Sequence, residues 1–128
     1  MGDLTRNISK HELCCKCPNC KVRIQDHEEI IQIVQYVCDH FAEYHGRSIR
    51  LEITSAARCR EHNLTVGSND ESQHIRCNAM DIKIFSDGHQ IPPEKVYRYA
   101  DKVFNFGYGI GNYQTFTHID TRSKKARW

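Results

Sequence analysis

The sequence predicts a single α+β domain in which helices flank an antiparallel sheet. The chain has 128 residues, a length that fits one compact domain with a buried core. Helical and strand patterns do not alternate regularly along it, whereas regular alternation is typical of a parallel sheet. Residues 1–25 differ from the rest as an irregular, cysteine-rich lead-in. The whole chain, residues 1–128, is therefore interpreted as one domain.

The most clearly marked helix covers about residues 27–45. Asp26 and Glu29 form a capping box, in which an acidic N-cap residue is followed three positions later by glutamate. The apolar residues that follow recur at helical spacing and therefore lie on one face. Gly46 is a typical C-terminal stop. The apolar face consists of Ile30, Ile31, Val34, Val37, Cys38 and Phe41.

Proline marks the start of a second helix. Pro92 and Pro93 stand together, and proline is favoured in the first turn of a helix, where its missing N–H is not needed. This helix is expected to run to about Phe104. A shorter helix over residues 60–66, ended by Gly67, is also predicted.

Three segments have the character of strands. Residues 49–54 alternate apolar and polar side chains, as a half-buried strand does. Residues 79–84 form a second predicted strand, and residues 115–120 are expected to be the final one. Residues 107–111 are glycine-rich and are interpreted as a turn or a strand.

Composition argues against several classes of function. The net charge is only +2, which is not the strong positive balance of a dedicated nucleic-acid binder, so no nucleic-acid partner is expected. No apolar run approaches the ~20 residues that span a bilayer. Residues 1–6 are polar and lack the apolar core of a secretory signal. The protein is therefore expected to be made in the cytoplasm, and another agent must release it if it acts outside.

Four residues are candidates for a metal centre: His74, Asp81, His118 and Asp120. A catalytic zinc needs three protein ligands and one exchangeable water. Two imidazoles and one carboxylate supply such a set and leave a net positive charge, which acidifies the bound water. His118 is expected on the strand next to that of Asp81, and on the same face as Asp120, because side chains alternate along a strand. A non-haem iron site of the His-x-Asp type is not favoured, because no histidine follows Asp120.

Seven short motifs occur in order along nearly the whole chain, from about Ser9 to Trp128. They occupy residues 55–63, 66–67, 72–74, 79–82, 107–111, 116–120 and 126–128. The ordered set resembles the zinc D-Ala-D-Ala carboxypeptidase and murein endopeptidase family, and its short phage- and prophage-type members in particular. This resemblance implies a hedgehog-like DD-peptidase fold and an activity on the stem peptides of peptidoglycan.

The family pattern implies roles for individual residues. The resemblance makes His74, Asp81 and His118 the ligands of one catalytic zinc. It places the family's arginine on Arg58, where a guanidinium can grip a substrate carbonyl or carboxylate with paired hydrogen bonds. A solvated or structural ion-pair role for Arg58 stays open beside this one.

Substrate binding is assigned to residues near these motifs. Ser72 lies two positions before His74 and either hydrogen-bonds substrate backbone or caps its loop. Tyr108 and Tyr113 lie near the glycine-rich segment and are expected to line a groove for a peptide.

The sequence departs from the family pattern at the proton-transfer residue. Many relatives place Glu or Asp three positions before the last histidine ligand, where this chain has Thr115. Asp120 is the nearest carboxylate in sequence. It could act as a catalytic base, orient His118 from behind, or fix the end of the strand, and the orienting role is favoured slightly. Cys77 and Met80 stand where the family usually has glycine and a small residue.

The lead-in carries Cys14, Cys15, Cys17 and Cys20, four of seven cysteines. Thiolate zinc sites use such Cys-x-x-Cys pairs but usually need a second pair, and Cys59 is the best candidate to come near. A second, structural zinc at Cys15, Cys17 and Cys20 is one interpretation. Reduced or disulfide-forming thiols are the other.

The expected function is that of a zinc peptidase acting on D-Ala-containing peptide bonds of the bacterial cell wall, as an endolysin or a virion component. Two other classes stay open. One is a binding module that keeps zinc for structure, which the absence of a carboxylate at Thr115 favours. The other is a cysteine-rich metal or redox-responsive interaction domain, in which the His and Asp residues are incidental.

Overall fold

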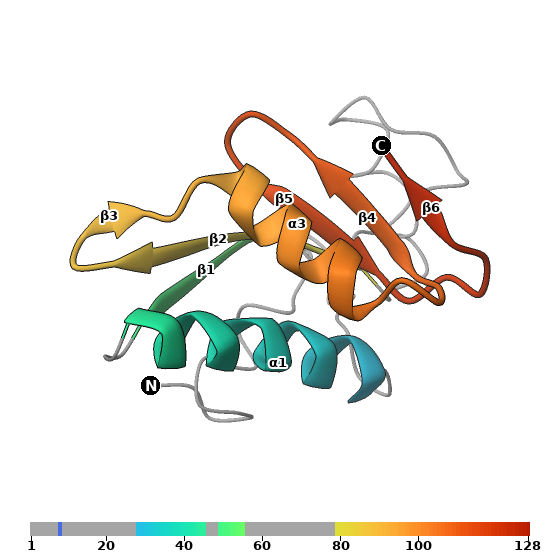
Figure 1. Cartoon of the computed structure of the whole chain (residues 1–128), viewed down its shortest axis with the longest axis horizontal. Helices are drawn as coiled ribbons and strands as arrows, with labels where there is room; N and C mark the ends of the chain where they lie inside the picture. The colour runs from blue at the N-terminus through green and yellow to red at the C-terminus, as the bar shows by residue number, and fades with distance from the viewer. Residues whose placement is uncertain (1–7, 9–27, 46–48, 56–78) are drawn as a thin grey trace, which may run out of the picture.

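The computed structural model of the chain describes residue 8 and residues 28–45, 49–55 and 79–128 (Figure 1). The cysteine-rich lead-in and the helix predicted over residues 60–66 lie outside the described residues, as do the predicted site residues Arg58, Ser72 and His74.

Within the described residues, six strands form one sheet in the order β1-β2-β5-β4-β6, with β3 paired to β2. The pairs are antiparallel except that β6 runs parallel to β4. The predicted α+β class is therefore confirmed, but the sheet is mixed rather than purely antiparallel. The strands are β1 (Arg50–Ser55), β2 (Ala79–Ser86), β3 (His89–Gln90), β4 (Gly109–Asn112), β5 (Thr117–Asp120) and β6 (Ala126–Arg127).

Two elements of the sheet are too short to show a strand pattern in the sequence. β6 has two residues, so it offers no apolar alternation, and the prediction that the sheet ends at residues 115–120 is wrong for that reason. β3 is formed by a two-residue turn at Asp87 and Gly88, whose φ angles of 54° and 77° have the sign that a tight hairpin turn requires.

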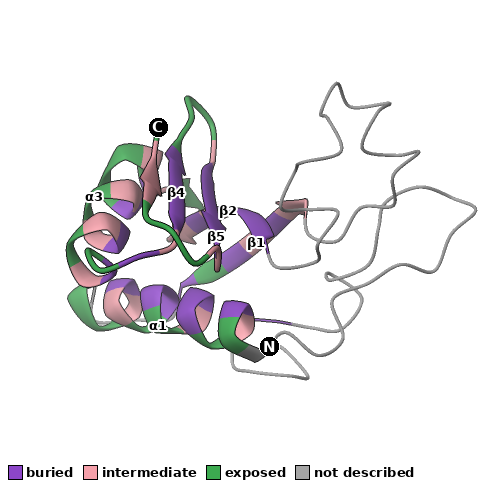
Figure 2. Cartoon of the chain, turned by 90° about the vertical axis from the view of Figure 1, so that its right-hand side faces the viewer, coloured by how far each residue is buried: buried purple, intermediate pink, exposed green. Residues whose placement is uncertain are grey.

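Helices α1 (Glu28–His45) and α3 (Pro93–Val103) pack on one face of the sheet (Figures 1 and 2). Both confirm the predicted helices. Pro92 is the N-cap residue of α3, so Pro93 occupies its first turn, where proline is favoured. The predicted apolar face of α1 is buried except for Ile31, which is partly buried, and Ile33 joins it.

Alternation along the strands divides the sheet into an apolar face and a polar face. Met80 and Ile82 of β2, Ile119 of β5 and Ile110 of β4 are fully or almost fully buried in the core under the helices. Met80 and Ile110 both pair with Ile119 across the strands. The residues between them therefore point to the opposite face, away from the helices.

Arg127 of β6 fastens the end of α3 to the sheet. Its guanidinium donates to Asp101 Oδ1 at 2.6 Å and to the carbonyl oxygens of Phe104, Gly107 and Tyr108 at 2.7–3.1 Å. A fifth bond, to the carbonyl of Ala126, is 2.9 Å long. One cation thus satisfies carbonyl groups that the helix end and the turn after it leave without helical partners.

The variant Arg127→Ala is expected to lower the free energy of unfolding by about 3 kcal/mol, because it removes the five hydrogen bonds of this partly buried guanidinium and leaves the Asp101 carboxylate without its arginine. Arg98→Ala is the matched control. Arg98 also pairs with a carboxylate, Glu94, but both side chains are more than half exposed, and the expected change is below about 0.5 kcal/mol. Urea denaturation followed by circular dichroism measures both, and equal effects would contradict a fastening role.

Candidate active site

The pairing of β2 with β5 brings three of the predicted site residues together, namely Asp81, His118 and Asp120. Asp81 lies directly opposite His118, and Ala79 lies opposite Asp120. Because Met80 and Ile119 point into the core, Asp81, His118 and Asp120 share the opposite face of the sheet. This is the arrangement that strand periodicity predicts: His118 on the strand next to Asp81, and on the same face as Asp120.

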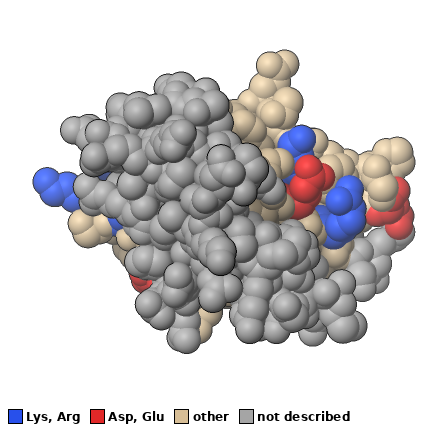
Figure 3. Space-filling view, turned by 180° about the vertical axis from the view of Figure 1, so that it is seen from behind, with Lys and Arg blue, Asp and Glu red and all other residues tan. Residues whose placement is uncertain are grey.

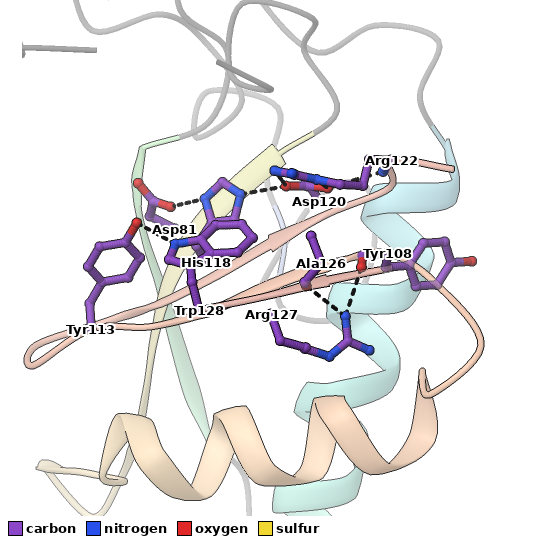
Figure 4. Close-up of polar contacts among 9 residues, drawn as sticks. All are labelled: Asp81, Tyr108, Tyr113, His118, Asp120, Arg122, Ala126, Arg127 and Trp128. Atoms are coloured by element: carbon purple, nitrogen blue, oxygen red, sulfur yellow. Dashed lines mark hydrogen bonds and ion pairs between the residues drawn. The ribbon is translucent and has the colours of Figure 1, made fainter. Parts of the chain in front are cut away.

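His118 lies between two carboxylates (Figure 4). Its Nδ1 is 2.8 Å from Asp81 Oδ1, and its Nε2 is 2.8 Å from Asp120 Oδ2. All three side chains are buried, and Asp120 is completely so. Each nitrogen of the ring therefore faces a carboxylate oxygen in a water-poor environment, where such contacts are strong.

Arg122 fixes the carboxylate of Asp120. Its Nε donates to Oδ1 at 2.8 Å and its Nη2 to Oδ2 at 2.7 Å, while its backbone N–H donates to Oδ1 at 3.1 Å. Burial alone would raise the pKa of Asp120, but the hydrogen bonds from His118 and Arg122 hold that pKa well below its usual value. Asp120 is therefore a fixed anion with both oxygens occupied. That arrangement suits an orienting role better than proton transfer.

The pair Asp81 and His118 fits a metal ion. When the ring is neutral and Nε2 donates its proton to Asp120, Nδ1 presents a lone pair to an oxygen of Asp81, which is also an acceptor. Two acceptors at that distance need a cation between them, either a proton or a metal. An imidazole nitrogen and a carboxylate oxygen are ordinary zinc ligands, and a carboxylate behind the histidine is their usual support.

Two of the three predicted zinc ligands lie among the described residues. The described residues contain no group of three or more His, Cys, Asp or Glu side chains placed to hold a metal. Asp81 and His118 are two of the three predicted ligands, and the third, His74, lies outside the described residues. The second zinc site, predicted at Cys15, Cys17 and Cys20, also lies outside the described residues.

Two glycines of β4 leave room on the site face. Gly109 pairs with Asp120, and Gly111 pairs with His118. A Cβ atom on Gly109 would lie 2.5 Å from both carboxylate oxygens of Asp120 and 2.6 Å from Nε of Arg122. The glycine-rich motif thus allows the carboxylate and its arginine to lie directly against the neighbouring strand.

Gly109→Ala is expected to displace Asp120 and lower zinc affinity by about 10–100-fold, the usual cost of losing a supporting partner behind a metal ligand. Gly107→Ala is the control, because a Cβ there would meet its nearest atom at 3.9 Å. Competition with a fluorescent zinc chelator measures both affinities. Normal affinity in Gly109→Ala would show that the Asp120 carboxylate does not need this close approach.

Tyr108 contacts helix α1 and the aromatic residues before β4. Its hydroxyl donates to Glu29 of α1 at 2.8 Å, and its ring packs against Phe104 and Phe106. Burial, followed by the bond to Glu29, raises its pKa to about 12. Figure 4 shows the side chain pointing away from His118. A φ of 63° turns it in that direction, and the sequence gives no sign of this backbone conformation.

Thr115 is exposed in the connection between β4 and β5, and its carbonyl accepts a hydrogen bond from Gln90 at 2.9 Å. Many members of the family that this chain resembles have a carboxylate at the position of Thr115. Here that position holds a neutral, exposed side chain. Nothing in its contacts assigns it a part in proton transfer.

Sequence reasoning assigned no role to Arg122 or Trp128. Trp128 follows β6 and places its ring centroid 5.2 Å from that of His118. The Arg122 guanidinium lies 4.9 Å from the centroid of the Trp128 ring. The available signals were the arginine two positions after Asp120 and the terminal Ala-Arg-Trp motif, but neither spacing indicates a contact.

Comparison with known proteins gives one match. A family model described as Peptidase M15 matches residues 6–120, which is most of the chain. No curated protein and no solved structure gives a significant match.

Proposed function

This chain belongs to the peptidase M15 family, and from that premise we propose that it is a zinc peptidase that hydrolyses D-Ala-containing peptide bonds of bacterial peptidoglycan. Membership of the family implies a metallopeptidase. The observation that carries the proposal is the placement of His118, with Nδ1 facing Asp81 and Nε2 held by Asp120. A carboxylate behind the ring is the usual support of a histidine that binds a metal through its other nitrogen.

Each residue has a defined task in this proposal. His74, Asp81 and His118 would hold the zinc, which supplies an acidified water and polarises the scissile carbonyl. Asp120, anchored by Arg122, holds the Nε2 proton and so presents the Nδ1 lone pair. As the resemblance implies, Arg58 would grip the substrate oxyanion and Ser72 would bind its backbone.

A second candidate function is a cell-wall binding module that contains zinc but does not cleave. Two observations favour it. Thr115 supplies no carboxylate, and both oxygens of Asp120 are engaged by His118 and Arg122. The proton acceptor is therefore assigned neither to Thr115 nor to Asp120.

Digestion of purified sacculi decides between the two. The zinc-loaded protein is incubated with sacculi with and without a chelator, and the released products are identified by mass spectrometry. Chelator-sensitive release of D-Ala or of uncross-linked stem peptides is expected, and the product names the bond. Binding to sacculi without any release, across several wall chemotypes, would support the binding module instead.

In the view from behind, basic and acidic side chains of the described residues lie next to one another (Figure 3). Among the described helices, none has both the length and the apolar character that crossing a membrane requires. The proposal includes action on the wall after release, as a phage- or prophage-type lysis or virion protein.

Zinc is expected to change how stability depends on pH. Burial alone would lower the pKa of His118, but its hydrogen bonds to Asp120 and Asp81 raise it above 6.5 in the metal-free protein. A pKa raised by folding gives stability that is complete below the unfolded value and is lost as pH rises through the folded one. A bound metal needs the neutral ring, so binding releases that proton.

Stabilisation by zinc should therefore grow as pH rises towards the raised pKa of His118 and level off above it, where no proton competes with the metal for the ring. Thermal denaturation with and without zinc measures it. Calorimetry in two buffers of different ionisation enthalpy counts the released proton. A zinc effect that is independent of pH would place the metal on groups other than His118.

A further inference from the structure

Tyr113 and Trp128 form a hydrogen-bonded pair beside His118. The indole Nε1 donates to the Tyr113 hydroxyl oxygen at 2.7 Å. The Trp128 ring in turn packs at 5.2 Å from the imidazole of His118. Figure 4 draws the hydroxyl on the side of His118 that carries Asp81, whereas Asp120 and Arg122 lie on the other side. The Tyr113 hydroxyl thus lies on the side where the predicted metal would bind.

Both rings are held from several directions. The Tyr113 ring stacks on Phe116 with centroids 4.4 Å apart and planes only 11° from parallel. The Trp128 backbone bonds to both neighbours on β4, donating to the carbonyl of Ile110 at 3.2 Å and accepting from the N–H of Asn112 at 2.7 Å. Because both side chains are already held in place, a ligand that contacts them pays a smaller conformational-entropy cost on binding.

Strand β4 leaves space for the Tyr113 and Trp128 rings at Gly111. A Cβ atom on Gly111 would lie 2.7 Å from Cε2 and Nε1 of Trp128 and 2.9 Å from Cε2 of Tyr113. Glycine at this position is therefore required for both rings to take their places. Tyr113 and Trp128 nevertheless stay 40% and 43% exposed, so a ligand at the site can reach them.

The direction of the hydrogen bond determines what the hydroxyl can offer. The phenol oxygen accepts the indole proton, so its own O–H is still able to donate. Accepting one bond also polarises the hydroxyl and strengthens the bond that it donates. Its natural partners are carbonyl and carboxylate oxygens, which the scissile bond and the C-terminus of a wall peptide both provide.

We infer that the Tyr113 hydroxyl is a substrate-binding group, which donates a hydrogen bond to a carbonyl or carboxylate oxygen of the bound peptide, and that Trp128 is its positioning residue. The inference deepens the proposed function and rests on it for the class of ligand. It assigns no part in proton transfer to either residue.

The chain carries its own reporter for the test, because Trp128 is its one tryptophan. A non-cleavable phosphinate analogue of D-Ala-D-Ala is titrated into the zinc-loaded protein while tryptophan emission is followed, and calorimetry gives the same dissociation constant independently. A saturable change in emission is expected for the unmodified protein. No binding of the analogue, or binding without any change in emission, would overturn the inference.

Tyr113→Phe removes the hydroxyl but keeps the stacked ring, and it is expected to weaken binding about tenfold, the usual order for a hydrogen bond to a charged group. Tyr44→Phe is the matched control, since Tyr44 lies on α1 and is 75% exposed. Zinc affinity should not change in either variant, because neither tyrosine is a predicted zinc ligand. Equal binding by Tyr113→Phe and the unmodified protein would overturn the inference.

Trp128→Phe tests the positioning role by calorimetry, alone and combined with Tyr113→Phe. If Trp128 acts through the hydroxyl, its replacement weakens binding in the unmodified background but adds little once the hydroxyl is absent. A merely structural tryptophan would cost the same in both backgrounds, which would overturn its assigned role.

Digestion of sacculi separates this inference from the proposed function. Cleavage by the unmodified protein, with equal binding by Tyr113→Phe, overturns the inference alone. Absence of cleavage, with analogue binding that Tyr113→Phe weakens, overturns the peptidase proposal and leaves the inference standing for a binding module.

Discussion

His118→Ala is expected to abolish zinc binding at the site. Hydrolysis of wall peptides should fall by more than about 100-fold, because loss of a residue that only supports a metal ligand already costs up to that much. The ring supplies Nδ1 beside Asp81 and also joins that residue to Asp120. Its loss leaves two buried carboxylates without their common partner. Zinc content after dialysis and the rate of stem-peptide release measure the effect.

His89→Ala is the matched control, because His89 lies on β3 of the same sheet but is exposed. It should keep both zinc and activity. Cys17→Ala provides the opposite comparison: if the metal is bound by the cysteine cluster, that variant loses zinc while His118→Ala keeps it. Such a result would contradict the assigned site and favour the cysteine-rich interaction domain.

Asp120→Asn is expected to have the second largest effect, because it keeps the shape of the side chain but removes its charge. Zinc affinity should fall about 10–100-fold, since the amide no longer fixes the tautomer of His118. Stability should fall by about 3 kcal/mol. That is the lower end of the cost of breaking a buried pair, and it applies because the Arg122 side chain is 30% exposed.

Asp101→Asn distinguishes the two effects. Asp101 also pairs with an arginine, Arg127, at 2.6 Å, but it lies on α3 on the far face of the sheet. It should lose stability without any change in zinc affinity. If both aspartate variants retain zinc equally well, His118 is oriented by something other than Asp120.

Strand periodicity predicted much of the described site. It placed Asp81 and His118 on neighbouring strands and His118 and Asp120 on one face, because a period of two leaves little choice once Met80 and Ile119 are buried. An orienting role for Asp120 was slightly favoured from the sequence, but its anchoring by Arg122 was not predicted, because Arg122 comes after the strand has ended. No pattern within the strand signals its three hydrogen bonds to that carboxylate.

Other features depended on information that the sequence does not display. The hydrogen bond from Tyr108 to Glu29 was not predicted, because the sequence gives no sign of the positive φ at Tyr108. Trp128 reaches His118 only because the two-residue strand β6 pairs in parallel with β4. A strand of that length has no periodicity, and a parallel partner that lies close in sequence is uncommon.

The position of β2 and β5 inside the sheet has a consequence for dynamics. β2 is bonded to β1 and β5, and β5 to β2 and β4, so neither site strand is an edge. Interior strands open only when most of the domain unfolds, so their amide protons should exchange with solvent at the slowest rates. Asp81 and His118 then share the rigidity of the core. The conformational entropy of holding these two side chains in register is lost when the chain folds, before any ligand arrives.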